Sequence, residues 1–378
     1  MKNICKINPL IQLIPRKKFD QLCEKWEMNK GVRSFTTWEQ TCALILTHIM
    51  KLESYREISA TLGISRSTFS DANAKRSFGF FTELCDSILI EIRQQSTSRK
   101  VRKAIKNLLA IDSSECRIHG SLFDVAPWRR ERNSLGKKAG LKLHVVWNID
   151  GEWIEDFQIT PARQSDSPVA KEFKITSGYI YVFDRAYSDV GFWWKIVAEK
   201  SHFVSRLKAH QYNEKTLLKN AGNRDGVLCD HDWCPSMASF YNHPEVDKKA
   251  KFRHIVYRDP ETKKVFHFVT SDFKISALKI AEIYKRRWAV ELLFRWLKGH
   301  LNIRYFSAKN VNAVKILLSI AILVQLLVQL YRLVKRFKGS LWDCLRYFRT
   351  SLLRESLAAL GLCPDCRWNV FPVGAVRA

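Results

Sequence analysis

The sequence lacks the regular cysteine spacing of a disulfide-bonded framework, and we expect no amino-terminal signal peptide. Its ten cysteines are scattered through 378 residues, a pattern that favours a reducing compartment. We therefore expect a cytoplasmic protein with free thiols. A zinc site within Cys229–Cys234 or Cys363–Cys366 stays open as an alternative, although a structural zinc usually has two cysteine pairs at tighter spacing.

The chain has far fewer acidic than basic residues. The chain has 63 Lys and Arg against 37 Asp and Glu, which gives a net charge of +26 and points to a polyanionic partner. Charge alone leaves DNA, RNA and an acidic membrane open. The 12 Trp, 11 Tyr and 22 Phe exclude a disordered basic tail, which would be poor in aromatic residues. The composition is that of a folded basic protein, long enough for two or three domains.

An uninterrupted membrane-spanning run is also absent. The longest apolar stretch, Ile316–Leu330, is shorter than the roughly 18 residues that a span requires. Polar side chains at Ser319, Gln325 and Gln329 interrupt it. We therefore expect a buried core helix here and no membrane partner.

Four polar residues between Ile283 and Leu301 have the spacing of a single helical face. At about 100° per residue they fall within an arc of roughly 60°, while apolar residues gather on another face. The four are Tyr284, Arg287, Glu291 and Lys298. A carboxylate surrounded by a guanidinium, an ammonium and a phenol suits a metal ion and a phosphate held side by side.

Glu291 needs partner carboxylates to hold a divalent ion, and two candidates lie upstream. Asp112 and Asp184 each follow an apolar run that is typical of a buried strand, so we expect both at strand ends. Hard Mg²⁺ prefers a few oxygen ligands completed by water and phosphate. Asp112, Asp184 and Glu291 therefore form a candidate site for two Mg²⁺ ions, with Mn²⁺ as a substitute, that would carry out phosphoryl transfer.

The order of these motifs resembles a known family. Two strand-associated Asp residues followed by Tyr-x2-Arg-x3-Glu-x6-Lys are similar to the DDE transposases of the insertion-sequence-four family, whose signature is this YREK pattern. The resemblance runs from about Pro15 through the apolar helix after Val314 and fades after about Leu341. It implies an α/β fold with a ribonuclease-H-like catalytic core, interrupted by a β-rich insertion and flanked by helical terminal regions.

The resemblance and the residue patterns together give five regions. We expect a helical DNA-binding domain, the first part of the core, a β-rich insertion, the catalytic Glu helix and a helical carboxy-terminal region that can hold a partner subunit. Their boundaries are 1–103, 104–206, 207–274, 275–301 and 302–378. Two hairpins are expected, one around Asp150-Gly151 and one over 251–272. A helix is expected near Asp189–Glu199.

Residues Tyr55–Lys75 resemble a helix-turn-helix with Gly63 in the turn. Thr36 and Glu39 predict a capping box before an earlier helix. In this interpretation the second helix presents Arg66 and Thr68 to DNA. An ordinary helical hairpin is the alternative.

Further basic residues follow the first Asp strand, in the segment Trp128–Lys142. A charge run is usually a solvated surface, but beside a phosphoryl-transfer site it is equally compatible with DNA contact. The basic residues of this run are Arg129, Arg130, Arg132, Lys137, Lys138 and Lys142, and the candidates for DNA binding among them are Arg129, Arg130, Lys137 and Lys138. We expect His144 to be a satisfied core or rim histidine and Asp166 to be a helix N-cap, so neither is assigned to catalysis.

On the helix, Arg287 and Lys298 are interpreted as phosphate clamps, and Tyr284 as a residue that bonds phosphate or stacks on a displaced base. An ion pair of Arg287 with Glu291, four residues on, is the simpler alternative.

The resemblance implies an insertion-sequence transposase, which binds the terminal repeats of its element, cleaves there and joins the 3′-hydroxyl to target DNA. The implied partners are double-stranded DNA, both element ends and target, and a second copy of the chain in the paired-end complex. The location would be cytoplasmic and nucleoid-associated. A metal-dependent DNA nuclease on the same core and a catalytically silent DNA-binding regulator are the alternatives. Three retained acids, Asp112, Asp184 and Glu291, count against the regulator.

Overall fold

The computed structural model describes residues 9–97, 107–128, 138–212, 225–247 and 249–359. The chain divides into two compact units. The first comprises 1–100, 115–141 and 295–378 and is called here the helical unit; the second comprises 101–114 and 142–294 and is called the sheet unit. Strands β1 and β2 and helix α12 each run from one unit into the other.

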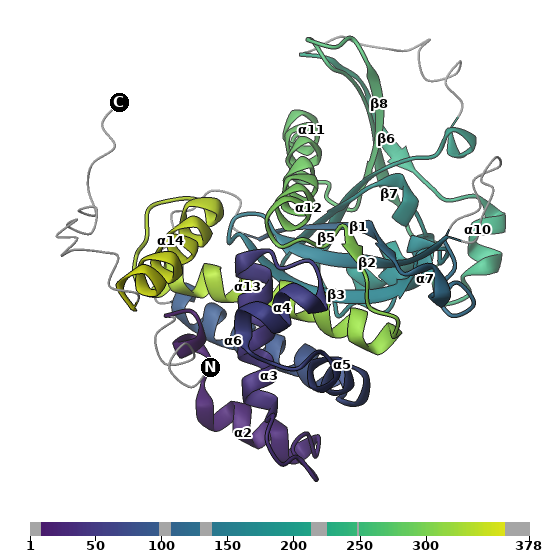
Figure 1. Ribbon diagram of the computed structural model, residues 1–378. Coiled ribbons are helices and arrows are strands. Elements are labelled where there is room, and N and C mark those ends of the chain that lie inside the picture. Colours follow the sequence, from purple (N-terminus) through teal and green to yellow (C-terminus); the bar gives the residue numbers. More distant parts are fainter. Residues whose placement is uncertain (1–8, 98–106, 129–137, 213–224, 248, 360–378) are drawn as a thin grey trace. The chain divides into compact units, whose positions relative to one another are not determined.

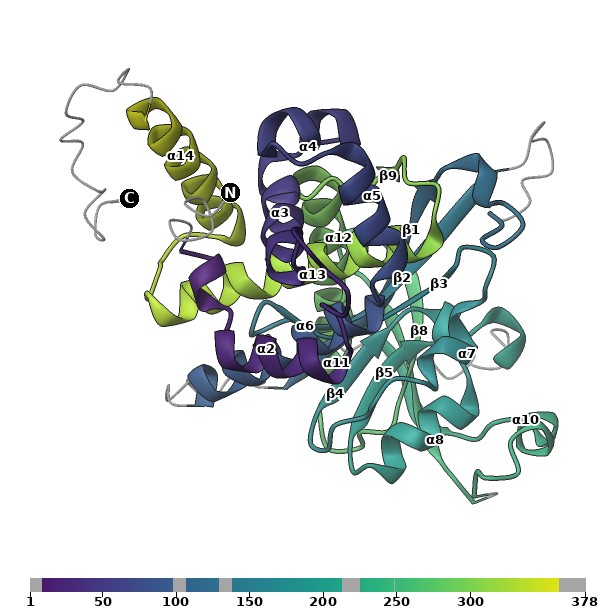
Figure 2. The same cartoon turned by 60° about the horizontal axis from the view of Figure 1, so that its bottom comes forward.

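The helical unit is built around one long apolar helix, α13 (Val311–Val334), which packs against α3, α5, α6 and α14 (Figure 2). The α-helices of this unit are α2 (Arg16–Lys25), α3 (Thr37–Met50), α4 (Tyr55–Leu62), α5 (Arg66–Lys75), α6 (Phe78–Thr97), α13 and α14 (Leu341–Ala359). Short 3-10 turns are η1 (Ile11–Leu13) and η2 (Gly120–Leu122). The expected capping box of Thr36 and Glu39 is present at α3.

Helix α13 is longer than its apolar run predicted. Its 24 residues would suffice, by length and composition, to cross a membrane, but 83% of the most apolar 18-residue window is buried inside the protein. The expectation of a core helix is confirmed on burial. The helix extends beyond the apolar run Ile316–Leu330 at both ends, and its first turns include polar Asn312 and Lys315.

Helices α4 and α5 are joined by a tight turn at Gly63, an arrangement that fits both the expected helix-turn-helix and the alternative of an ordinary helical hairpin. Gly63 ends α4 in the left-handed conformation, with φ at 66°, a backbone geometry that favours glycine. The side chains of Ile58, Leu62, Ile64 and Phe69 are buried, as the sequence pattern predicted. The hydroxyl of Ser65 caps α5 by accepting the backbone N–H of Thr68.

The sheet unit contains a mixed sheet with the strand order β3-β2-β1-β4-β5-β8-β7-β6 (Figure 1). The strands are β1 (Leu108–Ile118), β2 (Ala139–Asn148), β3 (Trp153–Pro161), β4 (Ile180–Phe183), β5 (His202–Arg206), β6 (Val227–Trp233), β7 (Phe252–Arg258) and β8 (Val265–Thr270). Strand β9 (Tyr305–Phe306), in the helical unit, pairs with the end of β1. Strands β1, β4 and β5 are mutually parallel in sheet order, whereas β8 is antiparallel to β5.

Both expected hairpins are present. Residues 149–152 connect β2 to β3, which are neighbours in the sheet, and 259–264 connect the antiparallel pair β7 and β8. The β-rich segment therefore continues the central sheet beyond β5.

Helices cover the two faces of the sheet. The α-helices of this unit are α7 (Asp166–Ala170), α8 (Val190–Ala198), α10 (Met237–Asn242), α11 (Ala277–Arg286) and α12 (Trp288–His300), with 3-10 turns η3 (Arg185–Tyr187) and η4 (Ala209–Gln211). Helix α8 packs Trp193 onto Phe203 and the core side of β4. Helix α11 contacts β4, β5 and β8.

Two local expectations were wrong. Strand β1 does not end at Asp112 but continues to Ile118, because Cys116 and Ile118 are still buried and the strand end pairs with β9. The segment around Glu291 is not one helix: α11 ends before Arg287, and α12 begins after it. At this junction the Val290 N–H bonds to the Arg287 carbonyl, three residues back, instead of continuing the α-helical pattern.

A buried histidine fixes the end of α12 within the helical unit. His48 of α3 is 3% exposed; its Nδ1 lies 2.7 Å from the Leu301 carbonyl oxygen and its Nε2 lies 2.9 Å from that of Leu317. Burial lowers the pKa of His48, against the opposing effect of the two carbonyls. The neutral ring has one N–H and donates it to one of these two carbonyls, so the contact connects α3 to another segment of the core.

We predict that His48→Leu lowers the free energy of unfolding by about 1–3 kcal/mol, because a buried carbonyl then loses its donor. Urea denaturation measures the loss. Met50→Ala, at an exposed position of the same helix, is the matched control and should change stability by less than about 0.5 kcal/mol. Equal effects of the two substitutions would show that the His48 bonds add nothing to stability.

Candidate active site

The strand register brings two of the three expected carboxylates together. On the parallel strands β1 and β4, Ile111 is paired with Phe183, so Asp112 and Asp184 follow at the same level. Neighbouring strands are about 4.8 Å apart, and residues at the same level point to the same face. Strand β5 continues the row, because Val182 is paired with Val204 and Arg206 stands level with Asp184.

Glu291 is connected to this row by Arg287. One guanidinium nitrogen of Arg287 donates to Asp112 at 3.2 Å, and the other donates to Glu291 at 2.5 Å. The Arg287 side chain is largely buried, with 13% exposed. Burial by itself lowers the pKa of Arg287, but Tyr284, Glu291 and Asp112 raise it overall. The ion pair with Glu291, the simpler alternative at the sequence level, is therefore present, and it extends to Asp112.

Asp184 lies beside a different guanidinium, that of Arg206. Arg206 lies 3.7 Å from Asp184, which also accepts the backbone N–H of Ala186 at 3.3 Å. The guanidiniums of Arg206 and Arg287 lie 5.7 and 5.8 Å from the centre of the Tyr284 ring. Burial raises the pKa of Tyr284, although both arginines oppose the shift. Tyr284 thus lies between two cations, each of which faces a candidate carboxylate.

Asp112 is the carboxylate with the clearest change of acidity. Burial raises its pKa to about 6; the Ser113 N–H and Arg287 lower the value, and the charges of Glu291 and Asp184 raise it. Glu291 and Asp184 are therefore close enough to Asp112 for their charges to act on it. A raised pKa produced by burial and like charges is typical of functional sites.

The chemistry of these side chains fits a divalent cation. Their donor set consists of carboxylate oxygens, which hard cations prefer. In this structure Arg287 supplies positive charge to two of them. Among the described residues, no group of three or more His, Cys, Asp or Glu side chains is already arranged to hold a metal. The same result covers Cys229–Cys234, where Asp230 is instead paired with Arg253; Cys363 and Cys366 lie outside the described residues.

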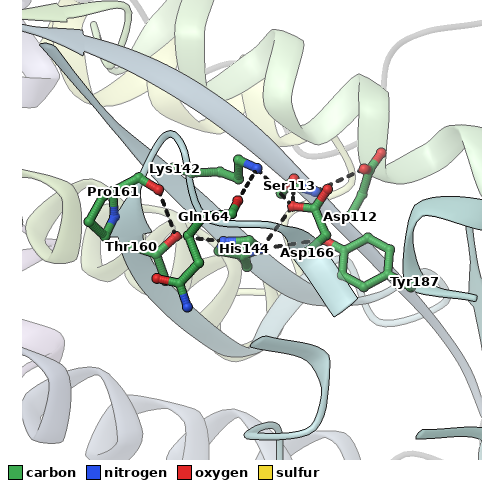
Figure 3. A network of polar contacts seen from close by, with 9 residues as sticks. All are labelled: Asp112, Ser113, Lys142, His144, Thr160, Pro161, Gln164, Asp166 and Tyr187. Atoms are coloured by element: carbon green, nitrogen blue, oxygen red, sulfur yellow. Dashed lines mark hydrogen bonds and ion pairs between the residues drawn. The ribbon is translucent and has the colours of Figure 1, made fainter. Parts of the chain in front are cut away.

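A buried polar network that no sequence pattern predicted lies next to Asp112 (Figure 3). Lys142 and His144 of β2 both approach the Asp166 carboxylate, at 3.1 and 3.5 Å. The Ser113 hydroxyl donates to the same carboxylate at 2.9 Å. His144 was expected to be a satisfied core histidine, which is confirmed: its ring is fully buried and bonds to Thr160 at 2.9 Å.

The expected role of Asp166 as an N-cap was wrong. Ser165 occupies the N-cap position of α7, and Asp166 is the first residue of the helix. Its side chain turns to Ser113 and Lys142. The available signal was weak: Lys142 and His144 alternate with apolar residues on a strand, which places them on one face, but nothing in the sequence indicates that Asp166 lies opposite them.

The remaining expected DNA-binding residues have different placements. Lys298 is half-buried in the last turn of α12, and its charge lowers the otherwise raised pKa of Cys116. Arg66 is exposed at the start of α5, and the half-buried Thr68 hydroxyl bonds to Ser65 at 2.8 Å. The backbone carbonyl of Lys138 accepts the Trp128 N–H. Arg129, Arg130 and Lys137 lie outside the described residues.

Comparisons with known proteins agree on one family. Residues 103–327 match the family model described as "Transposase DDE domain", and residues 4–68 match a domain of unknown function, DUF4372. A Sinorhizobium fredii protein named as a transposase is 29% identical over 279 residues, which are 73% of this chain and 74% of that protein. One from Geobacillus stearothermophilus, named for insertion sequence element IS5377, is 24% identical over 81% of this chain and 79% of its own.

A solved structure supports the same fold. The piggyBac transposase, in a synaptic complex with hairpin DNA, superposes with a TM-score of 0.52 at 15% sequence identity, over 96% of this chain and 84% of that chain. The family model covers more than half of the sequence, and its range contains Asp112, Asp184 and Glu291. The chain therefore belongs to the transposase DDE domain family.

Proposed function

We propose that this protein is an insertion-sequence transposase of the insertion-sequence-four type, which cleaves DNA at the ends of its element and transfers the 3′-hydroxyl to target DNA. The observation that carries the proposal is the convergence of Asp112, Asp184 and Glu291 around Arg287 and Arg206. Tyr284, Arg287, Glu291 and Lys298 are then the family signature, and the named insertion-sequence relatives support the assignment.

The sheet supports a ribonuclease-H-like core as part of this proposal. Strands β3, β2, β1, β4 and β5 lie in that order, with β1, β4 and β5 parallel, and the first two acids stand at the same level, Asp112 on β1 and Asp184 directly after β4. The β-rich segment between Asp184 and Glu291 then corresponds to the insertion that the family resemblance implies.

Asp112, Asp184 and Glu291 would hold two Mg²⁺ ions, or Mn²⁺ in their place. When bound, such ions activate the attacking water or 3′-hydroxyl and stabilise the departing oxygen. The chain's own residues position the DNA. Arg287 can hold a phosphate in a planar fork, Lys298 attracts the approaching strand as a point charge, and the Tyr284 hydroxyl contributes a donor between two guanidiniums.

DNA as the partner is supported by the charge of +26 and by the exposed start of α5 in the helix-turn-helix. A second copy of the chain is proposed because two element ends must be cleaved together. The protein would act in the cytoplasm, on the nucleoid. A nuclease built on the same core would share the first cleavage step but would form no joined product.

We predict that Asp112→Asn, Asp184→Asn and Glu291→Gln each reduce Mg²⁺-dependent nicking by at least about a thousandfold, because stabilisation by bound ions is worth several kcal/mol. Binding to the element end should persist in a gel-shift assay. Asp232→Asn, a solvent-exposed carboxylate on β6, is the matched control. Near-normal nicking by any of the three variants would remove that residue from the site. Nicking without strand transfer by the unmodified chain would instead identify a nuclease.

We predict that Lys298→Ala lowers paired-end assembly and cleavage together, with partial rescue at low salt. Losing one phosphate contact should reduce the slope of log affinity against log salt concentration by about 0.9. Arg295→Ala, an exposed cation on the same helix, is the control. Cleavage that is unchanged at every ionic strength, or a defect that follows a fall in melting temperature, would rule out the phosphate clamp.

We predict that Arg66→Ala and Thr68→Ala weaken binding to the element end by about tenfold more than binding to random DNA, because base contacts carry sequence discrimination. Competition binding measures both affinities. Lys75→Ala, at the other end of α5, should weaken both equally. Equal losses for Arg66 and Thr68 as well would assign them to non-specific contacts.

A further inference from the structure

The sheet unit contains an ion pair that is almost completely withdrawn from water. The Lys142 side chain is 2% exposed and the Asp166 side chain 11%, and their charged atoms are 3.1 Å apart. The ammonium also donates to the Gln164 carbonyl at 2.8 Å. A buried ion pair is weak evidence for stability, because removing two charges from water costs about as much as their attraction returns. Its presence beside the candidate site calls for a more specific role.

Ser113 connects this pair to Asp112. Its hydroxyl donates to Asp166 at 2.9 Å, while its backbone N–H donates to the Asp112 carboxylate at 2.8 Å. Successive side chains of a strand point to opposite faces of the sheet. Asp112 therefore points to the face of the sheet on which Arg287 lies, and Ser113 points to the opposite face, where its hydroxyl bonds to Asp166. This bond restrains the backbone next to Asp112.

Other contacts restrict Asp166 to this position. His144 Nδ1 lies 3.5 Å from the Asp166 carboxylate and 3.4 Å from the Tyr187 hydroxyl, and its Nε2 is bonded to Thr160 (Figure 3). Both His144 and Tyr187 are fully or almost fully buried. The group that holds Ser113 is thus itself fixed by residues of β2, β3 and η3.

We propose that the buried pair of Lys142 and Asp166, acting through Ser113, positions the Asp112 carboxylate for divalent cation binding. This inference rests on the proposed function, because it assumes that Asp112 is a cation ligand. Lys142, Asp166 and Ser113 are positioning residues and touch neither cation nor DNA. Outer residues that orient metal ligands typically change metal affinity by 10–100-fold when they are removed.

The test uses the full-length chain and Mn²⁺, with free Mn²⁺ quantified by its paramagnetic resonance signal. Ser113→Ala removes the link while keeping the backbone N–H and both charges of the pair. Asp166→Asn removes the charge that faces Lys142. The matched control is Asp230→Asn, which breaks the 2.6 Å ion pair with Arg253 elsewhere in the same unit. Melting temperatures are measured on the same samples, so that a loss of folding is separated from a loss of affinity.

We expect Ser113→Ala and Asp166→Asn to weaken Mn²⁺ binding by about tenfold at temperatures where the variants are folded, and Asp230→Asn to leave it within twofold. If Asp166→Asn does not fold, Ser113→Ala alone decides. Mn²⁺ affinity within twofold of the unmodified chain for Ser113→Ala would overturn the inference and leave the network a purely structural role. Absence of saturable Mn²⁺ binding in the unmodified chain would overturn both the inference and the proposed cation site. This outcome is distinct from failure of the inference alone, in which the unmodified chain and Ser113→Ala bind Mn²⁺ equally well.

Discussion

Charge balance around a buried carboxylate is the constraint on which the candidate site of the sheet unit depends. Burial disfavours ionisation of Asp112 and raises its pKa, and the negative charges of Glu291 and Asp184 add to this effect. The structure balances this charge with two guanidiniums: Arg287 bonds to Asp112 and Glu291, and Arg206 lies beside Asp184. Four segments must meet for this to happen: β1, β4, β5 and the junction of α11 and α12. The parallel register of β1, β4 and β5 supplies Asp112, Asp184 and Arg206, and the junction of α11 and α12 supplies the rest.

The parts of the fold that local rules control could be predicted from the sequence. Apolar runs located β1 and β4, the Asp150-Gly151 pair located the turn between β2 and β3, and Gly63 located the turn of the helix-turn-helix. Asp112 and Asp184 were predicted as candidate site residues because each stands where an apolar, strand-like run ends. Periodicity also placed Glu291 and Arg287 near each other, since four residues span about one helical turn.

The rest depended on contacts between distant segments. Asp166 follows a Ser and precedes a Pro, which locally favours an N-cap, yet its carboxylate turns to Lys142 and Ser113, 24 and 53 residues away. Arg206 is an ordinary strand-end arginine until the sheet order places it beside Asp184. The interruption at Arg287 was missed for a related reason: the sequence there has no Gly or Pro, so the break reflects the tertiary position of the side chain.

The contacts of Arg287 bear on how the site would work under the proposed function. The guanidinium of Arg287 has five N–H donors, and in this structure its two terminal nitrogens donate to Asp112 and Glu291, while Nε is buried without a partner among the described residues. The two N–H groups that bond to the carboxylates cannot at the same time donate to a DNA phosphate. A divalent cation at the carboxylates would replace the charge that Arg287 supplies and release its guanidinium for phosphate. Under the proposed function, ion pairing with Glu291 and clamping of phosphate would be successive roles of one side chain, and this would couple cation binding to DNA binding thermodynamically.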